Sequence, residues 1–363
     1  MREDLLFFAQ VLAGRRLHPP SVRHGPTLCR TRCDLRLGGA GRTARPGERA
    51  VRRRERRRRP ALAESGPHRP LRRRRSVSPG ARERREDRTD MAGTDTTTYA
   101  MGNTSGEAVR LDVQDALYAG CTEYLLRAAG LREGMRVLDV GCGTGGVSLA
   151  AARIVGPGGQ VVGVDMNPEV LKVARRNAAA ADIRNVSFEH HVLPDVELPE
   201  PVDALVGRLI LMHLADPAAV VKELTGLVRP GGLVTFQEIN ISRARAVPDV
   251  PLVTRCREWI CAGQREAGSD PDMGERLPHV LRSAGLAAPA VAVAVPTGGA
   301  VSTAMTLVAE TVRSLLPLIE RSGVADGQDV DVETLRGRLS DACAEVRATL
   351  YLSELVAAWG RLD

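Results

Sequence analysis

The stretch VLDVGCGTGGVSLAAARIVGPGGQVVGVDMNP, residues 137–168, carries the residue types best suited to hold an anionic or adenosine-containing ligand. Glycines permit positive φ and let the backbone approach a ligand closely. A helix that starts after them offers free N–H groups and a partial positive charge. Asp165 ends the next apolar run, where a carboxylate can accept hydrogen bonds from two ribose hydroxyls. The glycines and the acid before them are Asp139, Gly141, Gly143, Gly145 and Gly146.

The glycine spacing alone leaves the class of ligand open. Positions 141, 143 and 146 satisfy G-x-G-x-x-G, which is typical of dinucleotide sites but weak as a signal by itself. An NAD-dependent oxidoreductase is therefore one interpretation, although the sequence contains no Tyr-x-x-x-Lys pair and its only lysines are Lys172 and Lys222. A cofactor-binding protein without catalysis is another.

The elements that must position these residues alternate between short apolar runs and stretches of helical periodicity. This alternation predicts an α/β fold with a parallel sheet and crossover helices. The expected strands are 136–140, 161–165, 186–189, 202–206 and 232–238, and the helices between them are 146–155, 168–181 and 216–228. Pro168 is expected at the first turn of its helix, Asp216 as an N-cap, and Pro230–Gly232 as a turn that ends before the next strand.

The segments on either side of this core are mainly helical in pattern. Residues 107–129 predict a helix with an irregularity near Gly120. After residue 240 the pattern predicts an insertion or cap followed by closing strands. Its expected helices are 251–267, 274–284, 302–322 and 331–347, and its expected strands are 290–295 and 354–359.

Four strings occur in a fixed order along this core: VLDVGCGTGG, VVGVD, RLILMHLADP and LVRPGGLVTFQE. Over about residues 99–240 the chain resembles the small-molecule branch of the class I S-adenosylmethionine-dependent methyltransferases. The resemblance implies a Rossmann-like, doubly wound, mostly parallel seven-stranded sheet with helices on both faces and a helical cap. It also implies S-adenosyl-L-methionine as cofactor and methyl transfer to O, N or C of a small organic acceptor. No metal is expected, because the cysteines include no CxxC pair.

The same resemblance implies roles for particular residues. Asp139 and the glycine turn would face the methionine part of the cofactor, Asp165 would bind the ribose diol, and Met166 would pack against the adenine. The opening Y-x-x-G…E-x-x-R-L-x-x-Q matches residues 99–114. Its Tyr99, Arg110 or Gln114 would help to close the carboxylate end of the cofactor.

The sequence departs from the family pattern where an acid usually holds the adenine amino group, because His191 stands there. Either His191, the Val192 backbone or Asp195 takes over this contact, or the adenine site is looser. His190 and His191 could equally be exposed loop residues. Arg208 is expected to contribute to the cofactor site by ordering the loop that follows it.

Methyl transfer requires a nucleophile held about 3 Å from the methyl group and the exclusion of water. A base is needed only where the acceptor carries a proton of high pKa. His213, after the fourth strand, and Glu238, near the end of the fifth, are the candidate bases. Each could instead be a satisfied polar residue beneath the loop.

Charge divides the chain into two unlike parts. Residues 1–90 hold 26 Arg, no Lys and 10 Asp or Glu, whereas residues 91–363 hold 25 basic and 34 acidic side chains. The Arg-rich leader is expected to be disordered. It is either an arm for nucleic acid or a membrane surface, or the product of a misplaced start, because Met91 begins a plausible protein. The acidic remainder is a poor electrostatic match for a polyanion and argues against nucleic acid as a partner.

We therefore expect a leader over 1–90, an N-terminal helical lid over 91–130, a cofactor-binding core over 131–240 and a substrate cap with closing strands over 241–363. Seven scattered cysteines without a CxxC pair suit a reducing cytosol, and the sequence predicts no transmembrane segment. The expected protein is cytoplasmic and acts in secondary metabolism on a small molecule, with a homodimer as the candidate assembly.

Overall fold

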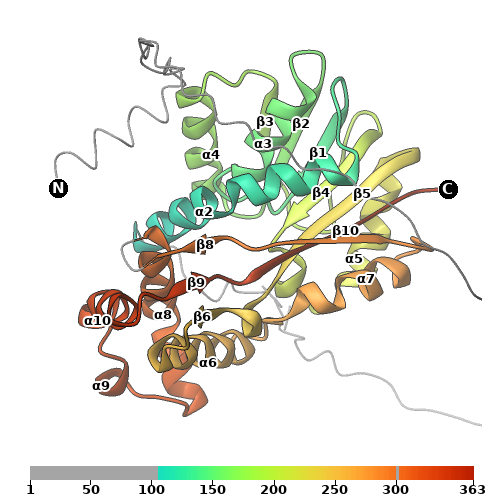
Figure 1. Cartoon of the computed structure of the whole chain (residues 1–363). Helices are drawn as coiled ribbons and strands as arrows, with labels where there is room; N and C mark the ends of the chain where they lie inside the picture. Colours follow the sequence, from blue (N-terminus) through green and yellow to red (C-terminus); the bar gives the residue numbers. More distant parts are fainter. Residues whose placement is uncertain (1–104, 300–301) are drawn as a thin grey trace, which may run out of the picture. The chain divides into compact units, whose positions relative to one another are not determined.

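A seven-stranded sheet forms the centre of the computed structural model, which describes residues 105–299 and 302–363 (Figure 1). The leader and Tyr99 lie outside the described residues. The strand order is β3-β2-β1-β4-β5-β10-β7, and all strands run parallel except β10, which is antiparallel to both its neighbours. The strands are β1 Arg136–Val140, β2 Gln160–Asp165, β3 Val186–His190, β4 Val202–Arg208, β5 Val228–Asn240, β7 Ala290–Ala294 and β10 Glu354–Arg361.

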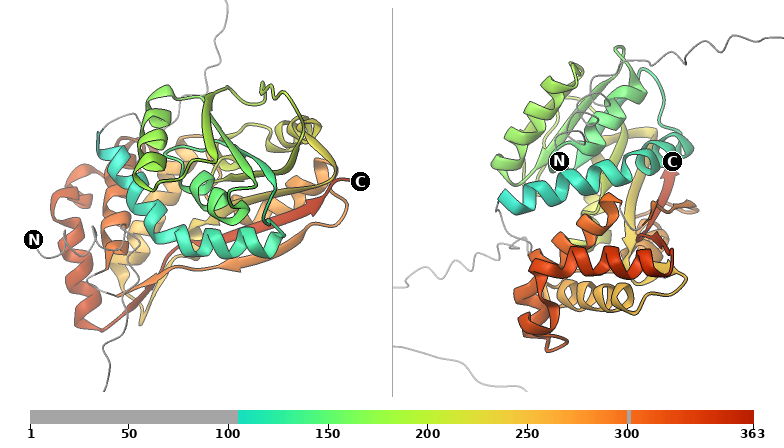
Figure 2. Two further views of the ribbon diagram at one scale, coloured as in Figure 1. Left: turned by 90° about the horizontal axis from the view of Figure 1, so that it is seen from above. Right: turned by 60° about the vertical axis from the view of Figure 1, so that its left-hand side comes forward.

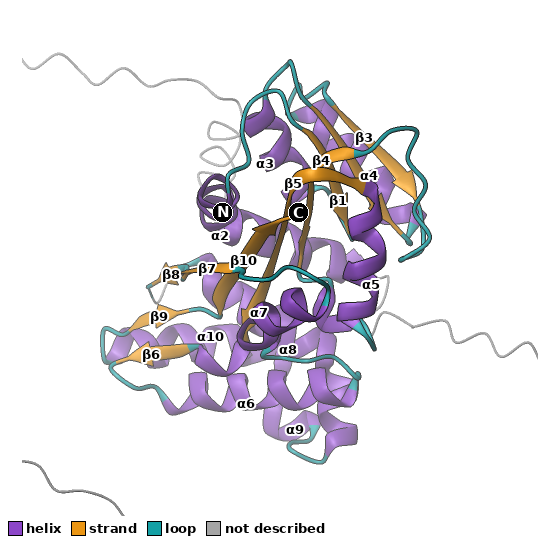
Figure 3. Ribbon diagram, turned by 90° about the vertical axis from the view of Figure 1, so that its right-hand side faces the viewer, coloured by secondary structure: helices purple, strands orange, loops and turns teal. Residues whose placement is uncertain are grey.

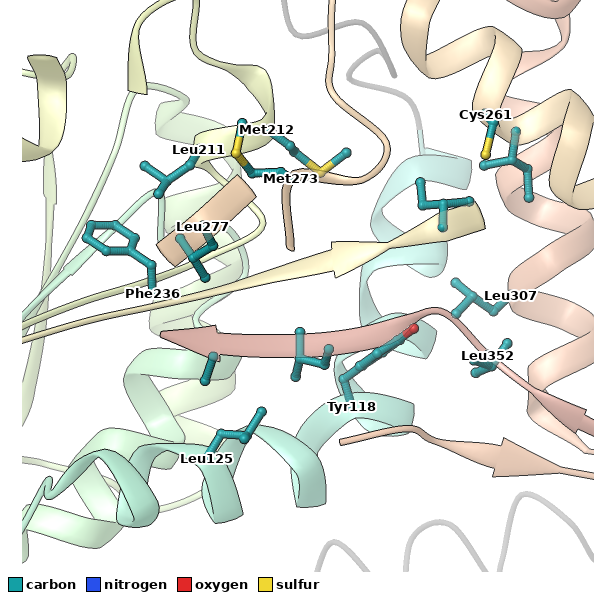
Figure 4. Packing of buried hydrophobic residues seen from close by; sticks show 14 of the residues in the cluster. Tyr118, Leu125, Leu211, Met212, Phe236, Cys261, Met273, Leu277, Leu307 and Leu352 are labelled. Carbon is teal, nitrogen blue, oxygen red and sulfur yellow. The ribbon is translucent and has the colours of Figure 1, made fainter. Parts of the chain in front are cut away.

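The central strands are almost fully buried, as strands covered by helices on both faces must be. Tyr118 and Leu125 of helix α2 (Ser105–Ala129) pack on one side of β5 and β10, and Leu277 of α7 (Met273–Ser283) packs on the other (Figure 4). The remaining crossover helices are α3 (Gly146–Val155), α4 (Pro168–Ala180) and α5 (Pro217–Leu224). The doubly wound α/β fold is confirmed.

The helical cap is built from two insertions into this plan. Helix α6 (Pro251–Glu266) lies between β5 and α7, and the segment between β7 and β10 supplies α8 (Thr303–Ser322), α9 (Gly327–Val330) and α10 (Val332–Glu345). Helix α8 packs against α6, α10 and α2, as Figure 2 shows. Helix α2 therefore contacts both the cap and the sheet.

Local signals fix most element boundaries where the sequence places them. Pro168 starts α4 after the Asn167 cap, and Asp216 caps α5 by accepting a hydrogen bond from the Ala219 N–H at 3.0 Å. Two expectations are wrong. Helix α2 continues through Gly120 without a break, and Pro230–Gly232 lies within β5, where the β4–β5 register shifts, rather than before the strand.

A second, three-stranded antiparallel sheet is not predicted from the sequence. Its order is β6-β9-β8, from strands Arg245–Val247, Thr349–Tyr351 and Thr297–Gly298 (Figure 3). Strands of two or three residues are too short to show alternation.

Candidate active site

The turn between β1 and α3 is shaped by glycines in the left-handed region of φ. Gly141, Gly143 and Gly145 have φ of 67°, 52° and 90°, which L-residues with a side chain seldom adopt. A Cβ added at Gly143 would meet no atom within 4 Å, so this part of the turn faces open space. The turn can therefore receive a ligand against its backbone.

Asp165 is fixed beside this turn at the end of β2. Its Oδ2 accepts a hydrogen bond from the Gly143 N–H at 2.9 Å, and its Oδ1 accepts one from the Asn167 N–H at 2.9 Å. Burial raises the pKa of this carboxyl, although the backbone hydrogen bonds oppose the shift. Each oxygen keeps a second lone pair, so the carboxylate can also accept two hydroxyl groups of a ribose.

Two apolar side chains beside Asp165 are exposed. Met166 is 45% exposed and Val192 is 50% exposed. His190 Nε2 lies 3.0 Å from the Met166 carbonyl oxygen, which holds the Met166 backbone against β3. A flat aromatic ligand placed on these two side chains would remove apolar surface from water.

His191 is turned into its own loop. Its Nδ1 lies 3.3 Å from the Asp195 carbonyl oxygen and its Nε2 lies 3.6 Å from Glu189 Oε2, while its backbone N–H donates to the Asp165 carbonyl. Residues Val192 and Asp195 form an isolated bridge in this tight turn. His191, Val192 and Asp195 therefore all lie in the turn that borders the exposed Met166.

Asp139 is completely buried beneath the glycine turn. Ser148 Oγ donates to its Oδ2 at 2.5 Å, whereas its Oδ1 has no hydrogen-bond partner among the described residues. Burial raises the pKa of Asp139 to about 7. Buried acceptors without partners are rare, and this one suits a ligand that brings a donor such as an ammonium group.

Helix α2, which contacts the turn through Asp115 and Thr144, carries two of the predicted residues. Arg110 is buried and donates to Gln114 Oε1 at 2.9 Å. Arg208, at the end of β4, reaches α2 rather than the loop after it: it donates to Thr122 Oγ1 at 2.8 Å and forms an ion pair with Asp115. The expectation that Arg208 orders the following loop is replaced by a contact with the helix.

His213 lies in a short 3₁₀ helix after β4, and its Nδ1 is 2.9 Å from Ser269 Oγ. Burial lowers the pKa of His213 to about 4, and the positive charge of Arg110 adds to the shift. The imidazole is therefore neutral throughout the physiological pH range.

Glu238 supports the same loop from below. Its Oε1 accepts the N–H groups of Ile210 at 3.0 Å and Leu211 at 2.7 Å, and its Oε2 has no partner among the described residues. Complete burial raises the pKa of Glu238 to about 8. Its direct contacts are with the backbone of the loop that carries His213, so Glu238 holds this loop in position.

Three polar residues of the site were not singled out from the sequence. Asp115 and Thr122 on α2 bind Arg208, and Ser269 after α6 binds His213. These partners are 93, 86 and 56 residues apart along the chain. Nothing in the local sequence marks such pairs.

Comparison with known proteins matches the central part of the chain to methyltransferases. Residues 131–285 match the family model described as a methyltransferase domain. The chain is 38% identical over 120 residues to a ubiquinone biosynthesis O-methyltransferase of Xylella fastidiosa strain M23, and 38% identical over 118 residues to that of Serratia proteamaculans strain 568. Each match covers 32% of this chain and 47% or 48% of the relative, so the chain spans about half the length of these relatives.

Among solved structures, the chain is similar to the YcgJ protein from Bacillus subtilis, with 17% identity, a TM-score of 0.43, and coverage of 67% of this chain and 98% of that one. Residues 131–285 of the chain therefore match a methyltransferase domain. The resemblance seen in its glycine turn, strand ends and PGG segment is thereby confirmed.

Proposed function

We propose that this protein transfers the methyl group of S-adenosylmethionine to a hydroxyl oxygen of a small organic molecule. The observation that carries the cofactor assignment is the carboxylate of Asp165, held by the Gly143 and Asn167 amides next to the exposed Met166. This arrangement offers acceptors for a ribose diol and an apolar surface for an adenine.

The remaining groups of the site fit the methionine part of the cofactor. Asp139 Oδ1 is a buried acceptor that needs a donor, and an ammonium group supplies one. Arg110 and Gln114 would hold the carboxylate end from α2. When bound, S-adenosylmethionine supplies an electrophilic methyl group on a sulfonium sulfur.

His213 is the base that we propose for a hydroxyl acceptor. A pKa near 4 leaves the imidazole unprotonated at physiological pH, so its nitrogen can accept a proton, but as a weaker base than an ordinary histidine. Ser269 fixes the orientation of the ring. Glu238 holds the loop that carries His213 through the Ile210 and Leu211 amides. A positioned base of this kind contributes about 10²- to 10⁴-fold to a rate.

The relatives named above support oxygen as the acceptor atom, because both carry the name of an O-methyltransferase. Their printed names point to ubiquinone biosynthesis, so the expected role in secondary metabolism stays a prediction. Among the described residues, no helix is long and apolar enough to cross a membrane. The cytoplasmic location, the absence of a nucleic-acid partner and the homodimer also stay predictions.

The test is a transfer assay with the full chain and S-adenosylmethionine labelled in its methyl group. The acceptors are a panel of phenols and catechols, with primary and secondary amines of matched size. We expect label on hydroxyl acceptors, and we expect His213→Ala to lower kcat by about 10²-fold. The matched control is His279→Ala, because His279 is exposed on α7.

Transfer to amines alone would overturn the oxygen acceptor. Transfer to phenols at an unchanged rate in the His213→Ala variant would remove His213 as the base.

A further inference from the structure

Asp115 joins α2 to the glycine turn and to β4 at a single point. One carboxylate oxygen accepts a hydrogen bond from Thr144 Oγ1 at 3.0 Å, and the other forms the ion pair with Arg208. Both partners are largely buried, because Thr144 is 4% exposed and the Arg208 side chain is 7% exposed. Charge-assisted hydrogen bonds in such surroundings are among the stronger ones in proteins.

The same carboxylate explains the fourth glycine of the turn. Gly146 is the first residue of α3 and does not have the positive φ that the other three glycines share. A Cβ at Gly146 would instead lie 2.5 Å from Asp115 Cγ, closer than real Cβ atoms come to a neighbour. Since Thr144 and Arg208 hold this short side chain, it cannot move aside without breaking their contacts.

We propose that Asp115 is a positioning residue that fastens α2 onto the glycine turn, and that residue 146 is glycine in order to make room for it. Gln114 precedes Asp115, and Arg110 lies on the turn of helix before it, bonded to Gln114. The fastened helix would therefore position the Arg110–Gln114 pair, which the proposed function assigns to the carboxylate end of the cofactor. This inference rests on the proposed function, because it assigns what α2 does at that cofactor site.

A second explanation exists for why residue 146 is glycine. In a G-x-G-x-x-G loop the third glycine can be required for close packing or close approach of a ligand. The two explanations predict opposite outcomes in a double-mutant cycle. If Gly146 only accommodates Asp115, the requirement for glycine disappears once Asp115 is replaced by alanine.

The experiment measures binding of S-adenosylhomocysteine to the full chain by calorimetry in wild type, Asp115→Ala, Gly146→Ala and the double variant. We expect each single variant to bind about tenfold more weakly, a factor that corresponds to about 1.4 kcal/mol. We expect the double variant to bind like Asp115→Ala alone. Gly120→Ala is the control on the same helix, since an added Cβ there meets nothing within 4 Å.

Hydrogen exchange of residues 110–122 without cofactor provides a reading that does not depend on the proposed function. We expect residues 110–122 to exchange faster in Asp115→Ala than in wild type. The double variant should exchange at the rate of Asp115→Ala. Asp115→Asn, which keeps the shape and an acceptor for Thr144 but loses the charge, is expected to fall between wild type and Asp115→Ala in both measurements. Should the alanine variant not fold, Asp115→Asn serves in its place in the single-variant comparisons, which test the loss of the charge.

The proposal is overturned if Asp115→Ala and Asp115→Asn bind and exchange like wild type. It is also overturned if Gly146→Ala weakens binding as much in the Asp115→Ala background as in wild type, because Gly146 would then face the ligand itself. A wild-type chain that binds no S-adenosylhomocysteine would refute the proposed function, while the exchange rates would still decide whether Asp115 fastens α2.

Discussion

Two buried carboxyl groups, Asp139 and Glu238, have pKa values near neutrality for the same physical reason. Burial disfavours the charged form, and the hydrogen bonds that each accepts only partly compensate. Both groups keep one oxygen without a partner among the described residues. Asp139 can gain a donor when a ligand binds above it, whereas Glu238 lies under the loop that carries His213.

Glu238 should make the stability of the protein depend on pH. Its pKa is 4.5 as an ordinary side chain and about 8 in the folded protein, so the unfolded chain loses this proton first as pH rises. The free energy of unfolding should therefore fall between about pH 4.5 and 8 in wild type, and this part of the fall should disappear in Glu238→Gln. Urea unfolding at pH 5 and pH 8 measures the difference.

The control for this experiment is Glu169→Gln, an exposed carboxylate on α4. Glu169→Gln should follow the wild-type change between the two pH values. If the free energy of unfolding changes by the same amount between pH 5 and pH 8 in Glu238→Gln and in wild type, Glu238 does not titrate in this range and the burial argument is wrong.

At the scale of residues, what could be predicted from the sequence was local. Asp139, Asp165 and the glycines belong to one strand–turn–helix–strand unit, so their types and spacing place them together. Asp115 and Ser269 could not be found in this way, because their partners are reached only after distant elements have packed.

At the scale of elements, α2 shows how tertiary packing outweighs local preference. Gly120 costs a helix interior about 1 kcal/mol relative to alanine, which is why the sequence predicts an irregularity there. The helix nevertheless runs unbroken from Ser105 to Ala129, because Leu125 and Leu126 are buried and Tyr118 Oη donates to the Ser353 carbonyl at 3.0 Å.

Gly120→Ala should therefore stabilise the protein. Gly120 is exposed, has ordinary helical geometry, and has open space where the Cβ would be placed. We expect the free energy of unfolding to rise by about 0.5–1 kcal/mol, measured by urea unfolding at fixed pH. An unchanged or lower value would mean that α2 does not continue through this position in solution.

At the scale of the whole molecule, the alternation of strands and helices was sufficient to predict a parallel α/β core. The cap helices were predicted close to their observed bounds, but their packing was not predictable, because it depends on apolar faces of α6 and α8 that pack on each other and not on the sheet alone. The three short strands of the second sheet were missed for lack of length.

The most direct test of the account is calorimetric titration of the full chain with S-adenosylhomocysteine and, separately, with NAD, in wild type and Asp165→Ala. The account predicts micromolar binding of S-adenosylhomocysteine and no binding of NAD. It also predicts at least tenfold weaker binding of S-adenosylhomocysteine in Asp165→Ala, because hydrogen bonds to a charged group contribute about 1.5–3 kcal/mol each. Binding of NAD without binding of S-adenosylhomocysteine would contradict it.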